Sequence, residues 1–380
     1  MSPEYIPYGR QVIEEEDIAA VAAVLRSDWL TTGPMVERFE QVFAAEVGSR
    51  HAVANSNGTA ALHLSMLAAG IEQGDEVIVP ALTFVASANC ARYVGATVRF
   101  ADVRADTLTI DVGHAASLVT PRTRAIVAVD FGGLPADLDE LAALAERHRL
   151  VLVEDASHAP GALYRGRKVG SIAHMTTFSF HPVKHLTTGE GGMVATNDER
   201  LAERLRRFRN HGIDTDHRQR ERTSTWRYDM IDLGFNYRLS DVQCALGLSQ
   251  LSRLPQSVER RRRLAARYAV AFGDTLRVQS EPDDRRSSWH LYAVRTLGPA
   301  PGELRKKVFD ELRSAGIGVN VHYLPVYLHS YYQSLGYPRG LCPEAELAYE
   351  GLLSLPMWAG LSDAAQDRVV ESIQAALRHA

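Results

Sequence analysis

Short apolar runs alternate with longer amphipathic segments along the first half of the chain. The apolar runs are rich in Val, Ile and Ala, as is typical of strands that are buried on both faces of a sheet. The segments between them repeat apolar residues with the period of a helix. This alternation predicts a mainly parallel sheet with helices on both faces. The predicted strands are HAVAN (51–55), EVIVP (76–80), ATVRFADV (96–103), RAIVAVD (124–130), LVLVED (150–155), TTFSF (176–180) and GMVATN (192–197).

A helix precedes these strands. Acidic residues open the pattern EEEDIAAVAAVLRS (14–27), in which Ile18, Val21, Val24 and Leu25 recur on one apolar face. The pattern is that of an amphipathic helix.

The pattern changes near residue 250. A long helical segment at 254–272 is followed by the β-rich run WHLYAVRT (289–296) and by further helices, an α+β order that indicates a second, smaller domain. We therefore predict a large domain at residues 1–252, which includes an extended N-terminal segment, and a small domain at 253–380. The polar segment 214–229 lacks an apolar period and is predicted to be a mobile loop.

Composition and charge exclude several classes of protein. Apolar residues make up 46% of the chain and charged residues 23%, as in ordinary soluble proteins. A formal net charge of −4 gives no reason to expect nucleic acid as a partner. No apolar run is long enough to cross a membrane, and the N-terminus does not resemble a signal peptide. Cys90, Cys244 and Cys342 are widely spaced, which predicts neither disulfides nor a zinc site and indicates a cytoplasmic protein.

Candidate chemistry lies at the ends of the predicted strands, where doubly wound sheets bind ligands. After the strand at 51–55, Asn57, Gly58 and Thr59 open a helix, and free amides at a helix N-terminus suit a phosphate. An ordinary helix N-cap would explain the same residues. Neither G-x-G-x-x-G nor a Walker lysine occurs here, which counts against dinucleotide-binding and P-loop sites.

A second candidate is the strand that ends in Glu154 and Asp155, with His158 three residues later. A buried carboxylate is costly without a positive partner. The pattern predicts either a cation that Asp155 holds in the cleft or an Asp that caps the next turn.

The third candidate is Lys184, which TFSFHPVKHLTTGEGG (177–192) places between a strand and a glycine-rich turn. A lysine that is desolvated in a cleft becomes a nucleophile for carbonyl groups. A phosphate cradle, a buried acid and a nucleophilic amine on three strand ends together fit pyridoxal phosphate. His181 and His185 have the spacing of a metal site, but Pro182 disfavours a helix and the glutamate of H-E-x-x-H is missing, so we expect no metal.

The chain resembles the sugar-nucleotide aminotransferases of the DegT/DnrJ/StrS type, which are fold-type I pyridoxal phosphate enzymes. The resemblance covers nearly the whole chain, through GPMVERFE, NGTAALHL, TFVASAN, FADV, EDASHA, FSFHPVK, EGGMVATND, GFNYRLSDVQCALGLSQL and VHYLPV. It implies a large, mainly parallel α/β/α domain, a smaller C-terminal α+β domain and a homodimer with shared active sites. IPYGRQVIEEEDI, SDWLTTGPMVERFE and HPVKHLTTGEGG are most similar to the transaminases of pseudaminic acid biosynthesis.

The resemblance also assigns roles to single residues. It implies that Lys184 is the Schiff-base lysine and that Asp155 is the partner of the pyridine nitrogen. His158 would lie near the phenolic oxygen of the cofactor, where many relatives have glutamine. Phe84 would stack on the ring, although an ordinary core aromatic would fit its position, and Asn236 would reach the phosphate of the neighbouring subunit. The phosphate would be held by Gly58, Thr59 and Ser179, and the sugar nucleotide would be contacted by Tyr8, Trp29, Leu30, Thr31, Asn57, Asn320, Val321, His322 and Tyr323.

The implied reaction transfers an amino group from an amino acid, expected to be L-glutamate, to the C4 ketone of a UDP-linked 4-keto-6-deoxy-N-acetylhexosamine, for cell-surface glycan biosynthesis. UDP-4-keto-arabinose, a dTDP- or GDP-linked ketohexose and amination at C3 stay open. Relatives that dehydrate sugars replace the lysine with histidine. Lys184 favours transamination here, although His185 stands beside it. A regulator that binds the cofactor without catalysis is the non-enzymatic alternative.

Overall fold

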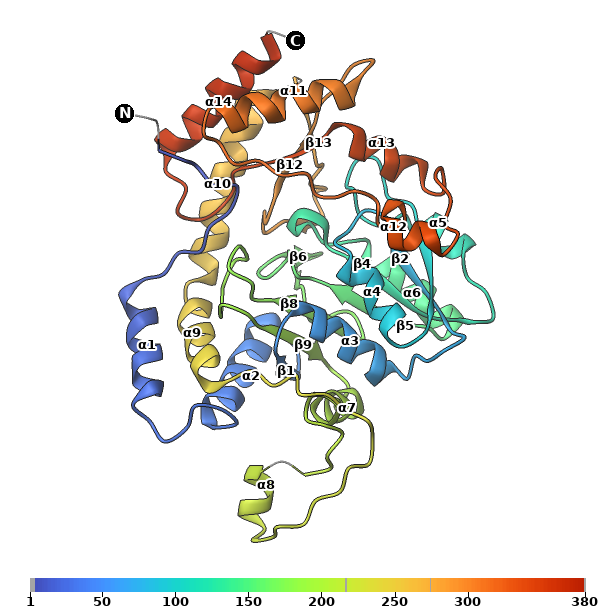
Figure 1. The fold of residues 1–380 in the computed structure, drawn as a ribbon, viewed down its shortest axis with the longest axis vertical. Coiled ribbons are helices and arrows are strands. Elements are labelled where there is room, and N and C mark those ends of the chain that lie inside the picture. The colour runs from blue at the N-terminus through green and yellow to red at the C-terminus, as the bar shows by residue number, and fades with distance from the viewer. Residues whose placement is uncertain (1–3, 216, 274, 379–380) are drawn as a thin grey trace.

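The computed structural model describes residues 4–215, 217–273 and 275–378. Its main feature is a seven-stranded sheet with the order β1-β9-β8-β5-β4-β2-β3 (Figure 1). Neighbouring strands are parallel, except that β9 is antiparallel to both β1 and β8. Each strand coincides with a predicted apolar run to within two residues, so the α/β prediction is confirmed. The strands are β1 (His51–Asn55), β2 (Glu76–Pro80), β3 (Thr97–Ala101), β4 (Thr123–Val129), β5 (Val151–Asp155), β8 (Met175–Ser179) and β9 (Gly192–Thr196).

Helices cover both faces of this sheet, because successive strand residues point to opposite sides. In β1, Val53 joins one apolar core with residues of α3, α4 and α7, whereas Ala52 and Ala54 join another with residues of α2 and α9. Residues of α5 and α6 pack on the sheet in a further core. No helix in the described ranges is long and apolar enough to cross a membrane. These helices are α2 (Pro34–Val47), α3 (Gly58–Ala69), α4 (Ala86–Tyr93), α5 (Val112–Ser117), α6 (Leu138–His148), α7 (Glu199–Arg209) and α9 (Asp241–Leu251).

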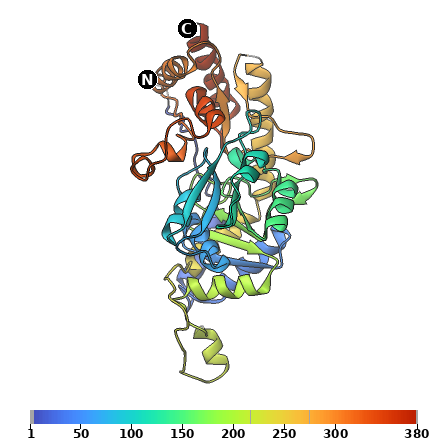
Figure 2. The same cartoon turned by 90° about the vertical axis from the view of Figure 1, so that its right-hand side faces the viewer.

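The C-terminal part of the chain builds a second, three-stranded antiparallel sheet with the order β10-β12-β13. Three helices share a separate apolar core with it. Figures 1 and 2 show this part above the large sheet, near both chain ends. Its elements are α10 (Leu254–Phe272), β10 (Arg277–Val278), β12 (Tyr292–Arg295), α11 (Pro301–Ser314), β13 (Leu352–Leu355) and α14 (Asp363–Arg378).

Short elements join the two parts. A small sheet with the order β11-β6-β7 pairs a strand from the C-terminal part with two from the first. Val326 and Tyr332, which lie late in the chain, are buried in a core of the large sheet. The short elements are η1 (Phe131–Gly133), β6 (Leu163–Tyr164), β7 (Arg167–Lys168), β11 (Arg285–Arg286), η2 (Val326–Leu328), α12 (Ser330–Ser334) and α13 (Pro343–Gly351).

The extended N-terminal segment packs on the C-terminal part. Ile6 is buried in the core of that part, donates its amide to the carbonyl of Gly316 and accepts the amide of Gly318. We propose that residues 253–380 form the small domain and that this segment completes it, although it precedes the large domain in sequence. The boundary at residue 252 stays a prediction.

Helix α1 (Glu15–Leu25) presents a different face from the one that its apolar pattern suggests. Val24 is buried, but Ile18 and Leu25 are more than half exposed, and Asp17 is only 1% exposed. The Asp17 carboxylate accepts hydrogen bonds from the side chains of Gln250 and Arg253, each at 2.6 Å. This polar anchor turns Asp17 inward and Ile18 outward, and sequence periodicity alone does not reveal it.

The polar segment at 214–229 contains a helix, α8 (His217–Arg222), where we predicted a loop. Figures 1 and 2 show it on an arm that projects from the body of the protein. Arg and Glu favour helix without any apolar period. Arg218 forms an ion pair with Glu37 at 3.0 Å, and Arg220 lies over the ring of Tyr228. Polar contacts therefore support a helix that has no apolar stripe.

Phe43 provides a test of the packing behind β8. It is fully buried and packs edge-on against Phe178 and Phe180, with ring centroids 5.0 and 5.5 Å apart. Phe43→Ala leaves a cavity and is expected to lower the free energy of unfolding by about 3–5 kcal/mol. Phe43→Leu keeps more of the side-chain volume, so it should lower the free energy of unfolding by clearly less. Denaturant unfolding measures both, and equal losses would contradict this account of the packing.

Candidate active site

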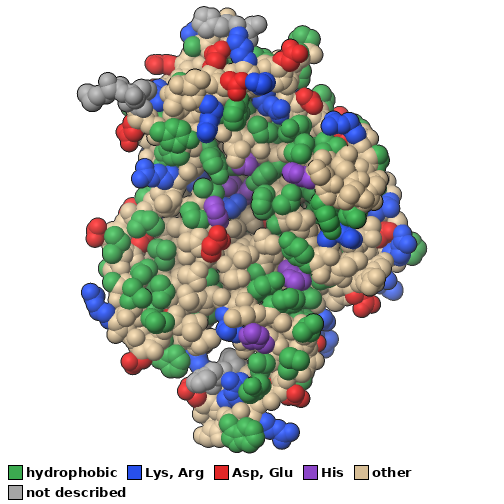
Figure 3. Space-filling view, in the orientation of Figure 1, with side chains coloured by type: hydrophobic (Ala, Val, Ile, Leu, Met, Phe, Trp, Pro, Cys, Tyr) green, Lys and Arg blue, Asp and Glu red, His purple; other side chains and the backbone are tan. Residues whose placement is uncertain are grey.

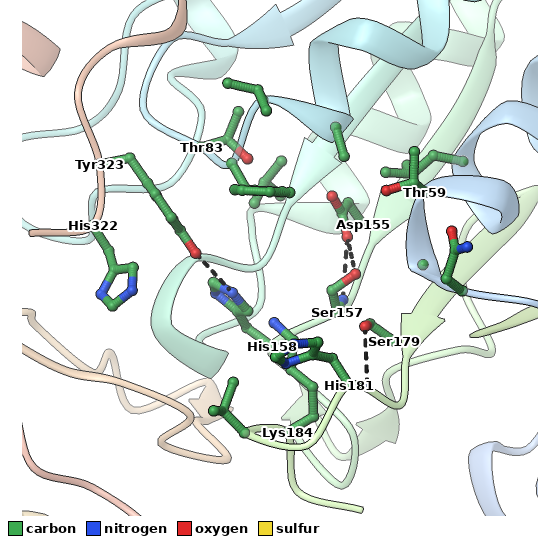
Figure 4. Close-up of a pocket in the computed structure, with 18 of the residues that line it drawn as sticks. Thr59, Thr83, Asp155, Ser157, His158, Ser179, His181, Lys184, His322 and Tyr323 are labelled. Carbon is green, nitrogen blue, oxygen red and sulfur yellow. Dashed lines mark hydrogen bonds between the residues drawn. The ribbon is translucent and has the colours of Figure 1, made fainter. Parts of the chain in front are cut away.

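A cavity of about 960 Å³ opens where the carboxyl ends of the parallel strands meet the C-terminal part of the chain. Figure 3 shows histidine side chains gathered in a hollow on this face. In Figure 4, Thr59 and Ser179 lie on one side of the pocket and His322 and Tyr323 on the other, with Lys184 between them. The volume lies near the upper end of the range for small-molecule sites.

Lys184 reaches this pocket from the turn that follows β8. The turn is fixed by its own backbone: Phe180 donates its amide to Gly191 at 2.9 Å, and Thr188 donates to Phe180 at 3.0 Å. The Lys184 amide donates to the carbonyl of His181. Lys184 is partly buried, and this burial lowers the pKa of its amine to about 8. A much larger fraction of the amine is therefore unprotonated at neutral pH than in a free lysine.

Buried imidazoles surround the lysine. His290 Nε2 lies 3.4 Å from Lys184 Nζ, and the His290 ring packs against those of His158 and His185, with centroids 4.3 and 5.6 Å apart. Burial lowers the pKa of all three histidines well below the usual value, and the charge of Lys184 lowers it further. Arg261, itself buried, donates to the carbonyl of His290. The neutral His290 ring can accept a hydrogen bond from the lysine.

Asp155 ends β5 and is held by neutral donors. Its Oδ2 accepts the hydroxyl of Ser87 at 2.7 Å, and its Oδ1 accepts the hydroxyl and the amide of Ser157 at 2.7 and 3.2 Å. Asp155 therefore caps the turn at Ser157, as one sequence interpretation predicted. It also lines the pocket, and the cation of the other interpretation stays a prediction. None of these donors carries a charge, so none of them neutralises the carboxylate.

The N-terminus of α3 forms another wall of the pocket. Asn57 is its N-cap and accepts the amide of Ala60 at 2.8 Å, which leaves the first amides of the helix free for a ligand. Gly58 packs tightly against Ser179: a Cβ on Gly58 would lie 2.9 Å from that of Ser179. The helix end and the hydroxyls of Thr59 and Ser179 form a cradle of the kind that binds phosphate.

The pocket brings most of the predicted site residues together. Phe84 is 53% exposed, with its ring centroid 6.0 Å from that of Tyr323, so it is not a core aromatic. Tyr323 also contacts His158, with its hydroxyl 3.3 Å from Nε2. The predicted residues that line the pocket are Tyr8, Asn57, Gly58, Thr59, Phe84, Asp155, His158, Ser179, Lys184, Asn320, Val321, His322 and Tyr323.

Four predicted residues lie elsewhere. Trp29, Leu30 and Thr31 are exposed in the connection between α1 and α2, and Asn236 is exposed next to Asn210. None of the four lines the pocket within this chain. A role for them in catalysis requires a second subunit.

Three residues that contact the predicted groups were missed from the sequence. Ser157 stands two residues after Asp155, and this Asx-turn spacing could have identified it. Ser87 and His290 lie 68 and 106 residues from their partners Asp155 and Lys184, and no local pattern indicates them.

The two histidines that flank Lys184 have different environments. His181 lines the pocket and is exposed, whereas His185 is buried, with Nε2 2.9 Å from the carbonyl oxygen of Ser288. Across the described ranges, no group of three or more His, Cys, Asp or Glu is placed to hold a metal ion. His185 does not line the pocket, so the neighbouring lysine is the group that is placed to react there.

Pyridoxal phosphate fits these residues. Lys184 offers an amine for its aldehyde, Asp155 offers a carboxylate with neutral donors for its protonated ring nitrogen, and the N-terminus of α3 offers donors for its phosphate. All three groups line one cavity.

Comparisons with known proteins agree with this fit. The sequence pattern of the DegT/DnrJ/EryC1/StrS aminotransferase family matches residues 11–374. The spore coat polysaccharide biosynthesis protein SpsC of Bacillus subtilis (strain 168) is 41% identical and covers 97% of this chain and 96% of its own. The pyridoxamine phosphate form of Spr1654 from Streptococcus pneumoniae has a TM-score of 0.94 at 32% identity, over 98% of this chain and 99% of its own. PseC of Helicobacter pylori, an aminotransferase involved in the biosynthesis of pseudaminic acid, has a TM-score of 0.92 at 32% identity, over 99% of this chain and 100% of its own. This chain therefore belongs to the DegT/DnrJ/EryC1/StrS aminotransferase family, whose members use pyridoxal 5′-phosphate.

Proposed function

We propose that this protein transfers an amino group from L-glutamate to the C4 ketone of a UDP-linked 4-keto-6-deoxy-N-acetylhexosamine, for glycan biosynthesis. The observation that carries the proposal is that one cavity joins Lys184 and Asp155 to the stretch from Asn320 to Tyr323. The first two residues suit the cofactor, and the last stretch offers amide, imidazole and phenol groups to a polar substrate. We propose a cytoplasmic enzyme, since Cys90, Cys244 and Cys342 are free and buried.

The cofactor supplies an aldehyde for amines and a ring that stores the electron pair released at the substrate carbon. Asp155 would hold a proton at the ring nitrogen, which makes that storage possible. Lys184 would move a proton between the α-carbon of the donor and C4′ of the cofactor, and its pKa of about 8 suits a base near neutral pH. His290 accepts a hydrogen bond from Lys184 and so orients the amine. Transfer to the sugar uses the same groups in reverse order.

The sugar half of the proposal is supported by relatives. SpsC is described as a spore coat polysaccharide biosynthesis protein, and PseC as an aminotransferase involved in the biosynthesis of pseudaminic acid. We propose that the Asn320 amide holds a hydroxyl group of the sugar and that His322 positions this amide. The His322 ring is itself fixed, because its Nδ1 lies 2.8 Å from the Ser354 hydroxyl and its Nε2 lies 3.2 Å from the Asn320 amide.

We also propose that the active enzyme is a homodimer with shared sites. Asn236 and the Trp29–Thr31 stretch are exposed outside the pocket of their own chain. The neighbouring arm carries the exposed apolar side chains Trp226, Met230 and Leu233, which a second subunit would cover. A two-fold axis would let each subunit complete the phosphate cradle of the other.

Lys184→Ala is expected to abolish both the visible absorption of bound pyridoxal phosphate and turnover, because no other amine replaces it at the cofactor aldehyde. The spectrum of the purified protein with the cofactor, followed by an assay with donor and sugar, measures both. Lys168→Ala, on the surface, is the matched control and should change neither. A Lys184→Ala enzyme with normal turnover would refute the assignment.

The function itself is tested in two half-reactions. Excess L-glutamate should bleach the visible band of the holoenzyme, and a UDP-linked 4-keto-6-deoxy-N-acetylhexosamine should restore it and gain an amine at C4. UDP-4-keto-arabinose and dTDP- and GDP-linked ketohexoses serve as competing substrates. If only one of these competing compounds restores the visible band, the proposed sugar is wrong and that compound is the acceptor. A band that no amino donor bleaches would favour the cofactor-binding regulator or the sugar dehydratase.

Asn236→Ala is expected to weaken retention of the cofactor through the partner subunit, as equilibrium dialysis would measure. A mixed dimer sharpens this test. If Asn236 acts across the interface, random pairing of Asn236→Ala with Lys184→Ala subunits leaves roughly a quarter of the sites free of both changes. Activity should therefore return on mixing two inactive or weakened proteins. If mixing does not restore activity, Asn236 either acts in the active site of its own subunit or has no role in catalysis.

A further inference from the structure

Two carboxyl groups lie buried behind Asp155 and have no part in the chemistry proposed above. Asp130 follows β4 and Glu154 precedes Asp155 in β5, and both are fully buried. Ala128 of β4 pairs with Glu154 in the strand register, so Asp130, two residues further on, belongs to the same face of the sheet. Asp155 points to the opposite face, toward the pocket. The two acids therefore lie on the far side of the sheet, next to the residue that would hold the cofactor ring.

Each acid has one buried oxygen without a hydrogen-bond partner. Asp130 Oδ1 accepts the amide of Ala136 at 3.0 Å, and Glu154 Oε2 accepts the hydroxyl of Thr176 at 2.7 Å. The remaining oxygens, Asp130 Oδ2 and Glu154 Oε1, are buried and have no hydrogen-bond partner in the described part of the chain. The strand register places both acids on the same face of the sheet. A carboxylate can only accept, so these two oxygens can pair only if one of the acids is protonated.

The electrostatic surroundings agree with one proton and one charge. Burial raises the pKa of both acids, and the negative charge of Asp155 raises both further. The neighbouring charge of Glu154 also raises the pKa of Asp130. The other contacts are neutral: the Thr176 hydroxyl and backbone amides. Two buried charges in contact are far more costly than one charge with hydrogen bonds.

We propose that Asp130 and Glu154 share a single proton at neutral pH, and that their remaining negative charge acts through Asp155 to keep the ring nitrogen of bound pyridoxal phosphate protonated. A second negative charge near the ring nitrogen favours its protonated form, because the interior screens charge weakly. The two acids are positioning residues, since neither lines the pocket. This proposal rests on the function proposed above, in which Asp155 contacts the ring nitrogen.

Asp130 also supports a loop that contacts the chain near His290. Its carboxylate accepts the amide of Ala136, and its backbone carbonyl accepts the amide of Gly133. The carbonyl of Gly133 in turn accepts the amide of Ser288, two residues before His290. A variant of the pair could therefore act through loop geometry alone, and the test must separate charge from structure.

Amide variants make this separation. Asp130→Asn or Glu154→Gln replaces the shared proton with an amide N–H and leaves one negative charge, whereas the double variant removes the charge and keeps a similar shape. Infrared spectra of the apoenzyme at pH 7 report the proton directly. Subtracting the spectrum of Glu154→Gln from that of the wild type should leave the carbonyl stretch of one protonated carboxyl group. Subtracting the spectrum of Asp130→Asn should leave the same band. Differences that contain only carboxylate bands, or two protonated groups lost in the double variant, would overturn the shared proton.

The effect on the cofactor is read from the nitrogen resonance of pyridoxal phosphate labelled with ¹⁵N in the ring. Each single variant should keep the ring nitrogen protonated at pH 7. The double variant should lower its proton affinity about tenfold, a shift of about one pKa unit. An unchanged titration in the double variant would overturn the role through Asp155. A shift of the same size in both single variants would also overturn it, because it would show an effect of loop geometry.

Asp155→Asn separates this proposal from the function on which it rests. If Asp155→Asn removes the proton from the ring nitrogen and the double variant does not, the proposal about the pair fails while the assignment of Asp155 stands. If Asp155→Asn leaves the ring nitrogen protonated, the cofactor orientation in the proposed function is itself wrong. The infrared result depends on neither, since it uses the protein without cofactor.

Discussion

The structure depends on holding an uncompensated carboxylate at the end of a buried strand. Asp155 is held by three donors, and all of them are neutral. An arginine in their place would neutralise the carboxylate and leave no charge for a ligand. Strand β5 lies at the centre of the sheet, and its last residue is held by one serine from the start of α4 and one from the turn that follows β5. Lys184 lies against the neutral imidazole of His290, and burial lowers the pKa of its amine despite the nearby charge of Asp155.

Local patterns in the sequence predicted the sheet well, because most strand residues are buried and most of the strands are rich in Val, Ile and Ala. The same patterns drew attention to Asp155, which ends such a strand, and to Lys184, which follows one. They could not locate Ser87 or His290, whose contacts join residues far apart in the chain. They predicted the wrong buried face for α1, because the ion pair with Arg253 holds Asp17 inward and leaves Ile18 exposed. The sequence drew attention to Glu154, but its partner Asp130 is evident only once β4 and β5 are side by side.

Several site residues come from the part of the chain that follows the large sheet. His290, Asn320, His322 and Tyr323 all belong to it, whereas Lys184 and the phosphate cradle belong to the strand ends. The buried Arg261 ties the first of these in place, since it donates to the backbone of His290 and of Met357. Cofactor and substrate would therefore be held by different parts of the same chain. The exposed residues Trp29–Thr31 and Asn236 suggest that a second chain adds to both.

This division has a consequence for engineering. The phosphate cradle tolerates almost no change, because even a methyl group on Gly58 would collide with Ser179. Val321 and Tyr8, by contrast, lie on irregular segments at the opposite wall, outside any helix or strand. A library that varies only these loop positions would keep the catalytic amine and its cofactor in place while the shape offered to the acceptor changes. Directed evolution toward new amino sugars could thus begin there, on a scaffold whose reactive centre needs no redesign.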